Sequence, residues 1–372
     1  MKKKHIIYQD KFRKIHNFSD VQYNKKIKKV GIIFGKFYPL HTGHIYLIQR
    51  AYSQVKNLYI ILCYDKKRDK KLFTNSSMSQ QPTVSDRLRW LLQTFKYQKN
   101  IHIFSFNETN KKFFYTWKKW STRIKIFLIK NKINPDIIYS GNKCDEKKYK
   151  KYFSSEVKII DSNRTFMNIS GEKIRQHPFR YWEYIPMEVK PFFVRKVTIL
   201  GGESSGKSIL VNKLANIFNT TSAWEYGRKY IFSHLGGSEM ALQYSDYDKI
   251  ALGHAKYIDF AVKYANKVTF IDTDFITTQA FCKYYEGKFH PFVQVLIDKY
   301  KFDLVILLKN NTPWINDGIR KLGNNKDRKN FQNLLIELLI KNRIKFVIIN
   351  SPSYEERFLN CVKLVKKLIM ID

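Results

Sequence analysis

Three segments of the sequence place residues suited to phosphate binding at the start of a predicted helix. The first, Gly35-Lys36-Phe37-Tyr38-Pro39-Leu40-His41-Thr42-Gly43-His44, contains an H-x-G-H element. We expect the imidazoles of His41 and His44 to converge at a helix N-terminus, where anions are favoured. Gly43 permits the close approach of a triphosphate. Two histidines in a loop without a neighbouring carboxylate or cysteine make a poor metal site, so we favour phosphate contact.

A second segment, Ile169-Ser170-Gly171-Glu172-Lys173-Ile174-Arg175, supplies the other half of this site. Ser170 starts a short helix whose N–H groups would face a nucleotide. Arg175 would bind the β- or γ-phosphate, and Lys36 would neutralise further charge. The segment is a weak signal by itself, but paired with H-x-G-H at this distance it predicts a nucleotide site.

The stretch Gly201-Gly202-Glu203-Ser204-Ser205-Gly206-Lys207-Ser208 fits the phosphate-loop pattern G-x-x-x-x-G-K-[ST] between a predicted strand and a predicted helix. Gly201 and Gly206 allow backbone N–H groups to turn toward phosphate oxygens. Lys207 would reach the β- and γ-phosphates, and Ser208 would bind the Mg²⁺ that accompanies ATP.

Two acidic residues, Asp272 and Asp274, end the next strong strand. A carboxylate there can hold the water shell of Mg²⁺ or take a proton from a hydroxyl acceptor. The spacing does not choose between the two, although a helix cap is the alternative for Asp274.

Several other residues in the C-terminal half of the chain each have two possible roles. Arg320 and Arg328 flank a polar loop and are candidates for a lid that brings positive charge to a transferring phosphoryl group, or they are surface arginines. Trp224 beside Glu225, with Arg228 nearby, could stack a base and hold a ribose hydroxyl, whereas core packing is the alternative for Trp224.

Composition excludes several classes of protein. A chain of 372 residues with 44% apolar residues can form two domains with sizeable cores, and it contains no run long enough to cross a membrane. Its four distant cysteines indicate reduced thiols in the cytoplasm. Lys accounts for 53 of the 68 basic residues behind the net charge of +37, which favours a solvated surface over a nucleic-acid site. The same surface is compatible with peripheral membrane association.

Alternating strands and helices predict two α/β domains, each a doubly wound parallel sheet. We expect strands at 29–34, 58–64, 101–106, 136–139 and 157–160 in a Rossmann-like domain, and at 196–200, 268–271, 304–308 and 346–349 in a P-loop domain. A linker with Pro178, Pro186 and Pro191 separates them. The predicted domains span residues 30–190 and 191–372, after a basic tail at 1–29.

These residues resemble the nucleotidyltransferase family, in which H-x-G-H and I-S-x-x-x-I-R bind ATP. The longer strings GKFYPLHTGHIYLIQRA, QQPTVSDRLRWLLQTFKYQKN and GGESSGKS, with AWEYGR and His177–Pro186, closely resemble the bifunctional NadR family. The resemblance runs from about Val30 to the C-terminus. It implies a nicotinamide-mononucleotide adenylyltransferase followed by a ribosylnicotinamide kinase, with ATP, nicotinamide mononucleotide, nicotinamide riboside and NAD as ligands and Mg²⁺ as cofactor.

The resemblance also implies which residues form the two sites. The adenylyltransferase site comprises Phe34, Gly35, Lys36, Phe37, Tyr38, His41, His44, Arg68, Trp117, Asn168, Ile169, Ser170 and Arg175. Trp117 would stack on nicotinamide, since a cationic ring favours an aromatic face. In the kinase, Gly201, Gly206, Lys207, Ser208, Arg320 and Arg328 would bind ATP, and Trp224, Glu225 and Arg228 would bind the riboside.

The resemblance leaves an alternative of a different class, a nucleotide-sensing DNA-binding regulator of NAD genes with weak or no catalysis. Some family members carry an N-terminal helix-turn-helix. The 29 residues before the first strand show no paired amphipathic helices, so we expect neither this module nor specific DNA binding. We further expect a homo-oligomer.

Overall fold

The computed structural model describes residues 29–109, 116–313 and 324–369 and divides the chain into two compact units. The first runs to Ser76 and from Gln80 to Arg175, and the second contains Ser77–Ser79 and Gln176–Asp372. By contacts, residues 176–190 therefore group with the second unit, whereas the sequence placed the boundary after 190.

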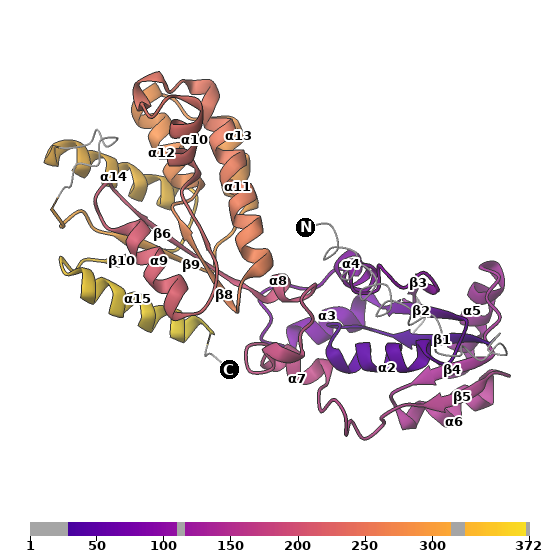
Figure 1. The fold of residues 1–372 in the computed structure, drawn as a ribbon. Helices are drawn as coiled ribbons and strands as arrows, with labels where there is room; N and C mark the ends of the chain where they lie inside the picture. The colour runs from indigo at the N-terminus through magenta and orange to yellow at the C-terminus, as the bar shows by residue number, and fades with distance from the viewer. Residues whose placement is uncertain (1–28, 110–115, 314–323, 370–372) are drawn as a thin grey trace, which may run out of the picture. The chain divides into compact units, whose positions relative to one another are not determined.

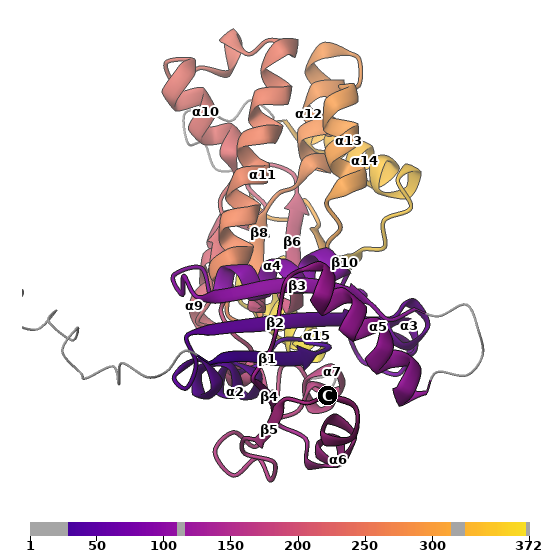
Figure 2. The same ribbon diagram turned by 90° about the vertical axis from the view of Figure 1, so that its right-hand side faces the viewer.

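The first unit is built on five parallel strands in the order β3-β2-β1-β4-β5, which can be followed down Figure 2. The strands are β1 (Val30–Gly35), β2 (Asn57–Tyr64), β3 (Ile101–Asn107), β4 (Ile137–Ser140) and β5 (Glu156–Ile159). The near-continuous apolar run of β2 is typical of a parallel strand covered on both faces. This order is that of a doubly wound sheet with the first strand in the centre, as predicted.

Helices cover both faces of this sheet. They are α2 (Thr42–Tyr52), α3 (Lys66–Thr74), α4 (Val84–Thr94), α5 (Trp117–Lys130), α6 (Lys143–Tyr152) and α7 (Gly171–Gln176). Helices α5 and α6 bury Trp120, Ile124 and Tyr149 against one face. Helices α2 and α4 contact the sheet with Ile48 and Leu91, both fully buried. Helices thus pack on both faces of the sheet, and the carboxyl ends of its strands are left for the loops.

The second unit is also built on five parallel strands, in the order β10-β9-β6-β8-β7. Its strands are β6 (Arg195–Gly201), β7 (Ser222–Ala223), β8 (Val268–Asp272), β9 (Leu304–Leu308) and β10 (Val347–Ile349). Its longer helices are α9 (Lys207–Ile217), α10 (Tyr226–His234), α11 (Tyr247–Tyr264), α12 (Phe275–Glu286), α13 (Pro291–Lys299), α14 (Asn325–Lys341) and α15 (Tyr354–Ile369), preceded by the short α8 (Lys190–Phe193). Helices α9 and α15 cover one face, and α11 to α14 cover the other (Figure 1).

Local polar contacts set where several helices begin. Helix α4 is one of them. The cap is Thr83, whose Oγ1 accepts from Asp86 N at 3.1 Å while Asp86 Oδ2 accepts from Thr83 N at 2.8 Å. This reciprocal capping box satisfies two N–H groups that a helix start leaves unpaired.

Helices with few apolar residues were not predicted from sequence. Helix α3 (KKRDKKLFT) and helix α6 (KCDEKKYKKY) each bury a single residue, Asp69 and Tyr149 respectively. Such segments carry no 3.6-residue apolar period, so only their Lys and Glu propensity and their caps indicate helix.

Two further predictions concern the described residues. All four cysteines, each within the described part, are free thiols, as expected. Among the described helices, none is long and apolar enough to span a bilayer.

Candidate active sites

In the first unit the H-x-G-H loop leaves the end of central strand β1 and enters α2. His41 is the residue that caps α2, with its Nδ1 accepting from His44 N at 3.3 Å. The two imidazole rings stack with centroids 3.6 Å apart. A Cβ added to Gly43 would lie 3.1 Å from His41 Nδ1, so glycine is what permits this approach. Both histidines therefore lie at a helix N-terminus, as predicted.

Two cavities adjoin this loop, one of about 660 Å³ and one of about 250 Å³. Twelve of the thirteen predicted adenylyltransferase residues line one or both. They are Phe34, Gly35, Lys36, Phe37, Tyr38, His41, His44, Arg68, Trp117, Ile169, Ser170 and Arg175. The exception is Asn168, which is exposed and whose side-chain oxygen accepts from Lys173 Nζ at 2.9 Å.

Burial and neighbouring cations lower the pKa values of three basic groups of this site. Burial lowers the pKa of His44 to about 3, with the Arg164 charge adding to the effect. Burial likewise lowers the pKa of His41, and the charges of His44 and Arg164 add to this effect. Burial also lowers the pKa of Lys36, and Arg68 adds to it. A bound anion would reverse these effects, because an opposite charge favours the protonated forms.

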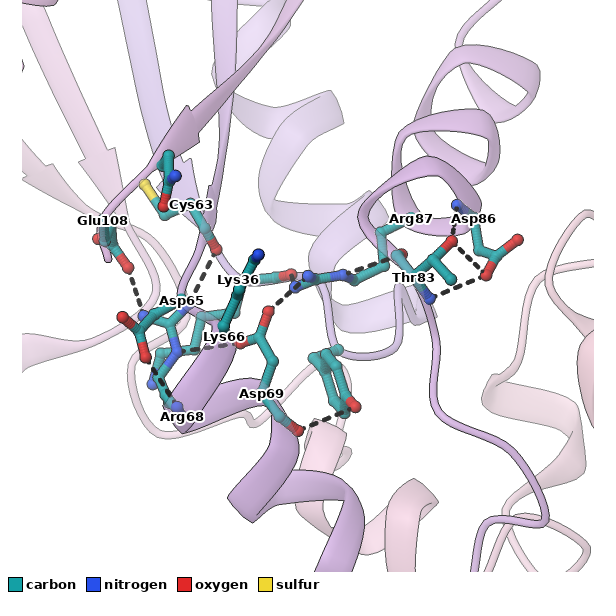
Figure 3. Close-up of polar contacts among 12 residues, drawn as sticks. Lys36, Cys63, Asp65, Lys66, Arg68, Asp69, Thr83, Asp86, Arg87 and Glu108 are labelled. Carbon is teal, nitrogen blue, oxygen red and sulfur yellow. Dashed lines mark hydrogen bonds and ion pairs between the residues drawn. The ribbon is translucent and has the colours of Figure 1, made fainter. Parts of the chain in front are cut away.

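A network of buried hydrogen bonds and ion pairs fixes the backbone of the H-x-G-H loop at Lys36 (Figure 3). Arg87 of α4 is 1% exposed, and its guanidinium donates to Lys36 O at 3.1 Å and to Asp69 Oδ2 at 2.6 Å. Arg68 donates from Nε to Asp69 Oδ1 at 3.2 Å and also bonds Glu108. The segment TVSDRLRW, noted above only as part of a resemblance, thus supplies the residue that fixes the Lys36 backbone.

Tyr38 and Arg175 connect this network to α7. The Tyr38 hydroxyl donates to Asp69 O at 3.1 Å, and Arg175 Nη1 donates to Tyr38 O at 2.7 Å. A Cβ on Gly171 would lie 3.0 Å from Tyr38 O. The two sequence segments predicted to form one site are therefore in direct contact.

In the second unit the phosphate loop leaves central strand β6 and enters α9. Gly206 caps α9 with φ of 84°, a conformation that favours glycine. Lys207 Nζ donates to Gly202 O at 3.0 Å. From α15, the buried guanidinium of Arg357 donates to Ser205 O at 2.6 Å and to Lys309 O at 2.8 Å, which fixes the loop from its far side.

The structure separates the two acidic residues at the end of β8. Asp274 caps α12, accepting from Ile276 N at 2.9 Å and from Thr277 N at 3.3 Å, while burial raises its pKa to about 7. Burial and the Glu225 charge raise the pKa of Asp272 to about 6, whereas Lys207, a hydrogen bond with Ser208, and Arg228 lower it. Asp272 therefore faces the phosphate loop, and Asp274 has the capping position that we listed as its alternative.

A cavity of about 150 Å³ extends from this loop between α10, α11 and α12. It is lined by Gly206, Lys207, Ser208, Glu225 and Arg228 from the predicted set. Sequence reasoning missed the rest of its wall, including His254, Tyr247, Thr277, Phe281 and Tyr285. These side chains lie on helices, where their spacing is that of ordinary core residues.

Three predicted kinase residues do not line this cavity, and a fourth lies outside the residues that the structure describes. Gly201 ends β6 below the cavity, with φ of 152°. Trp224 is 52% exposed and lines a neighbouring groove, which shares Glu225 and Arg228 with the cavity. Arg328 is buried and donates to Thr312 O at 3.0 Å. Arg320 lies outside the described residues.

The Arg87–Asp69 ion pair generates a stability prediction. Replacing Arg87 by Met leaves the Asp69 carboxylate and the Lys36 carbonyl short of a donor, and the loss of one partner of a buried pair costs about 3–5 kcal/mol. Urea unfolding followed by circular dichroism measures the change. Arg89, exposed two residues further along α4, supplies the control R89M. Equal stabilities of R87M and R89M would contradict this role of the network.

Comparisons with known proteins agree with the two halves. Residues 32–188 match a family model described as cytidylyltransferase-like, and residues 196–357 match one described as an AAA domain. A NadR protein crystallised with NR has a TM-score of 0.78 at 25% identity, covering 93% of this chain and 97% of that one. Another, with NAD and AMP-PNP, has a TM-score of 0.75 at 24% identity, which is a likeness of fold.

Curated relatives extend the match along the whole chain. The trifunctional NAD biosynthesis/regulator protein NadR of Salmonella typhimurium is 66% identical over 360 residues, which are 96% of this chain and 88% of the relative. The protein of the same name from Escherichia coli is 64% identical over the same shares. Together with the arrangement of the two sites, this identity shows that the chain belongs to the NadR family.

Proposed function

We propose that the chain is a bifunctional enzyme of NAD biosynthesis. Its second unit phosphorylates nicotinamide riboside with ATP, and its first unit joins the resulting mononucleotide to the adenylyl group of ATP, giving NAD and pyrophosphate. The observation that carries the proposal is that each unit has its own phosphate-binding loop at the end of a central parallel strand. The family relatives, named for NAD biosynthesis, and the NadR structure with NR support the choice of substrates.

Adenylyl transfer needs two nucleotides held end to end. We assign the 250 Å³ cavity, which His41 and Ile169 line, to ATP, and the 660 Å³ cavity, which Trp117 and Arg68 line, to the mononucleotide. Half-buried Trp117 packs edge-on against Trp120 at 5.0 Å, which leaves its ring fixed as a face for nicotinamide. Lys36, His44 and Arg175 would hold the phosphates. Catalysis is then positioning and charge stabilisation, without a covalent enzyme intermediate.

Phosphoryl transfer in the second unit has the 5′-hydroxyl of the riboside attack the γ-phosphorus of ATP. We assign Lys207 to the β- and γ-phosphates and Asp272 to the proton of the hydroxyl. Glu225 and Arg228 line the same cavity and would hold the ribose. Trp224 lines the adjoining groove that shares Glu225 and Arg228 with this cavity, and we assign it to the nicotinamide ring. We assign Arg320 and Arg328 to the lid region, with Arg328 positioning Thr312.

The same site suits Mg²⁺. Ser208 lies in the first turn of α9 and lines the cavity, so its hydroxyl oxygen would hold the ion. Hard cations prefer such oxygen ligands. When bound, the ion would neutralise phosphate charge.

We retain two predictions about the protein as a whole, namely that it forms a homo-oligomer and acts in the cytoplasm. Four free thiols and ATP as a substrate support the location. Exposed aromatic side chains on α10 and α11, including Phe232 and Phe260, support self-association.

The separate sites predict that each activity can be removed alone. His44→Ala should lower NAD formation from nicotinamide mononucleotide and ATP by at least about 10²-fold, because a phosphate donor is lost, and leave riboside phosphorylation unchanged. Lys207→Ala should do the reverse. Each variant is the control for the other in one chromatographic assay. Loss of both activities in either variant would argue against independent sites, and a wild type that binds nucleotides with neither activity would favour the regulator alternative.

The raised pKa of Asp272 predicts a pH dependence for the kinase. The ionised carboxylate is the active base, so kcat/KM should be flat above about pH 6 and fall about tenfold per pH unit below it. Asp272→Asn should cost about 10²–10⁴-fold above pH 6, and the cost should shrink below pH 6, where the wild-type base is itself protonated. Asp274→Asn is the matched control, because asparagine also caps helices. A D274N loss as large as that of D272N, or a flat profile down to pH 5, would contradict the assignment.

A further inference from the structure

We propose that Arg164 is a further catalytic residue of adenylyl transfer, whose guanidinium binds the phosphate groups at the point where the two nucleotides react. The inference rests on the proposed function of the first unit. Arg164 lies in a turn before α7, outside the residues that sequence patterns identified.

The two cavities of the first unit share part of their walls, and the shared part defines where the reacting groups meet. The polar side chains that line both cavities are those of His44, Asn142, Asp145, Tyr149 and Arg164. Lys36, Arg68 and Arg175 line the larger cavity alone. Within the described part of the chain, Arg164 is therefore the permanently charged cation common to both cavities.

The guanidinium of Arg164 differs from those of Arg68 and Arg87 in having no partner among the described residues. Arg68 bonds two carboxylates, and Arg87 bonds Asp69 and two carbonyls. Arg164 makes no side-chain hydrogen bond or ion pair with any residue that the structure describes. A guanidinium presents a planar fork of donors that matches two phosphate oxygens, so an unpaired one between two nucleotide cavities is suited to an anion.

The turn that carries Arg164 is held by a single carboxylate. Asp161 Oδ1 accepts from Thr165 N and from Thr165 Oγ1, both at 2.8 Å, and Asp161 Oδ2 accepts from Phe166 N at 3.2 Å. Arg164 N donates to Asp161 O at 3.0 Å. Within this turn Arg164 has φ of 54°, a left-handed conformation that residues with a Cβ adopt rarely. Such a conformation persists where the surrounding structure enforces it, often at a functional site.

Electrostatics place Arg164 close to both histidines. Its charge is among the causes that lower the pKa of His41 and of His44. His44 Nδ1 is buried without a hydrogen-bond partner among the described residues. The histidines are neutral donors or acceptors in this state, so Arg164 supplies the positive charge at the shared wall.

The reaction creates the charge that this residue would stabilise. An oxygen of the mononucleotide phosphate forms a bond to the α-phosphorus of ATP. The bond from the α-phosphorus to the bridging oxygen of the β-phosphate breaks, and pyrophosphate leaves with the electron pair. Charge rises on the remaining α-phosphate oxygens in the transition state. A cation beside them that bonds these oxygens more strongly in the transition state lowers the barrier more than it strengthens ground-state binding.

The test is Arg164→Ala, assayed for NAD formation from nicotinamide mononucleotide, ATP and Mg²⁺. We expect kcat to fall about 10²–10³-fold with a smaller change in KM, and free guanidine added to the assay to restore part of the loss. R164K should be intermediate, because ammonium keeps the charge without the fork. Arg50→Ala is the matched control, since Arg50 is exposed on α2 and lines neither cavity.

Riboside phosphorylation by the same variant reports on its folding. An active wild type with R164A at the wild-type rate would overturn the inference alone. A fall that guanidine does not restore, or that R50A shares, would also overturn it. A wild type that makes no NAD from mononucleotide and ATP would overturn the proposed function of the first unit, and the inference with it.

Discussion

A loop that binds a triphosphate must point several backbone N–H groups in one direction, and a parallel sheet offers this where its central strand ends. In the first unit β1 lies between β2 and β4, and in the second β6 lies between β8 and β9. The connections from the central strand and its neighbour leave on opposite faces, which opens a crevice at the carboxyl ends. Each loop then enters a helix whose N-terminus favours anions. Every other feature of the two sites depends on this placement.

Both units hold their loop with a buried guanidinium from a distant helix. Arg87 donates to Lys36 O, and Arg357 donates to Ser205 O. Fixing a carbonyl on the inner side of a loop leaves the adjacent N–H groups directed outward, toward a ligand. A buried charge is costly unless it is fully bonded, so neither arginine is replaceable by a residue that makes fewer bonds. The two units thus use the same physical device although their strand orders differ.

The fold was predictable because its strands are apolar and its loops carry phosphate-binding patterns. Strands such as 58–64 and 304–308 have no competing period, and the two loops fix which helix follows which strand. Helices α3 and α6 were missed because they bury almost nothing, and the cap of α4 was not identified because Thr83 precedes the apolar pattern.

The sites were predictable where function depends on a short pattern, and not where it depends on tertiary contact. Histidines 41 and 44 and Lys207 come from such patterns. The roles of Asp272 and Asp274 depend on where β8 ends, a matter of one or two residues that spacing does not resolve. His254 lies on a helix and Arg164 lies in an irregular turn, so nothing local marks either.

The most direct measurement follows phosphorus atoms through both sites. Purified protein is incubated with nicotinamide riboside, Mg²⁺ and ATP labelled separately at the α- and γ-phosphorus, and the product NAD is isolated. If the two units act in series, NAD carries the γ-label on the phosphate next to the nicotinamide ribose and the α-label on the phosphate next to adenosine. Absence of NAD, or γ-label that stops in the mononucleotide, would contradict a chain in which both sites are active.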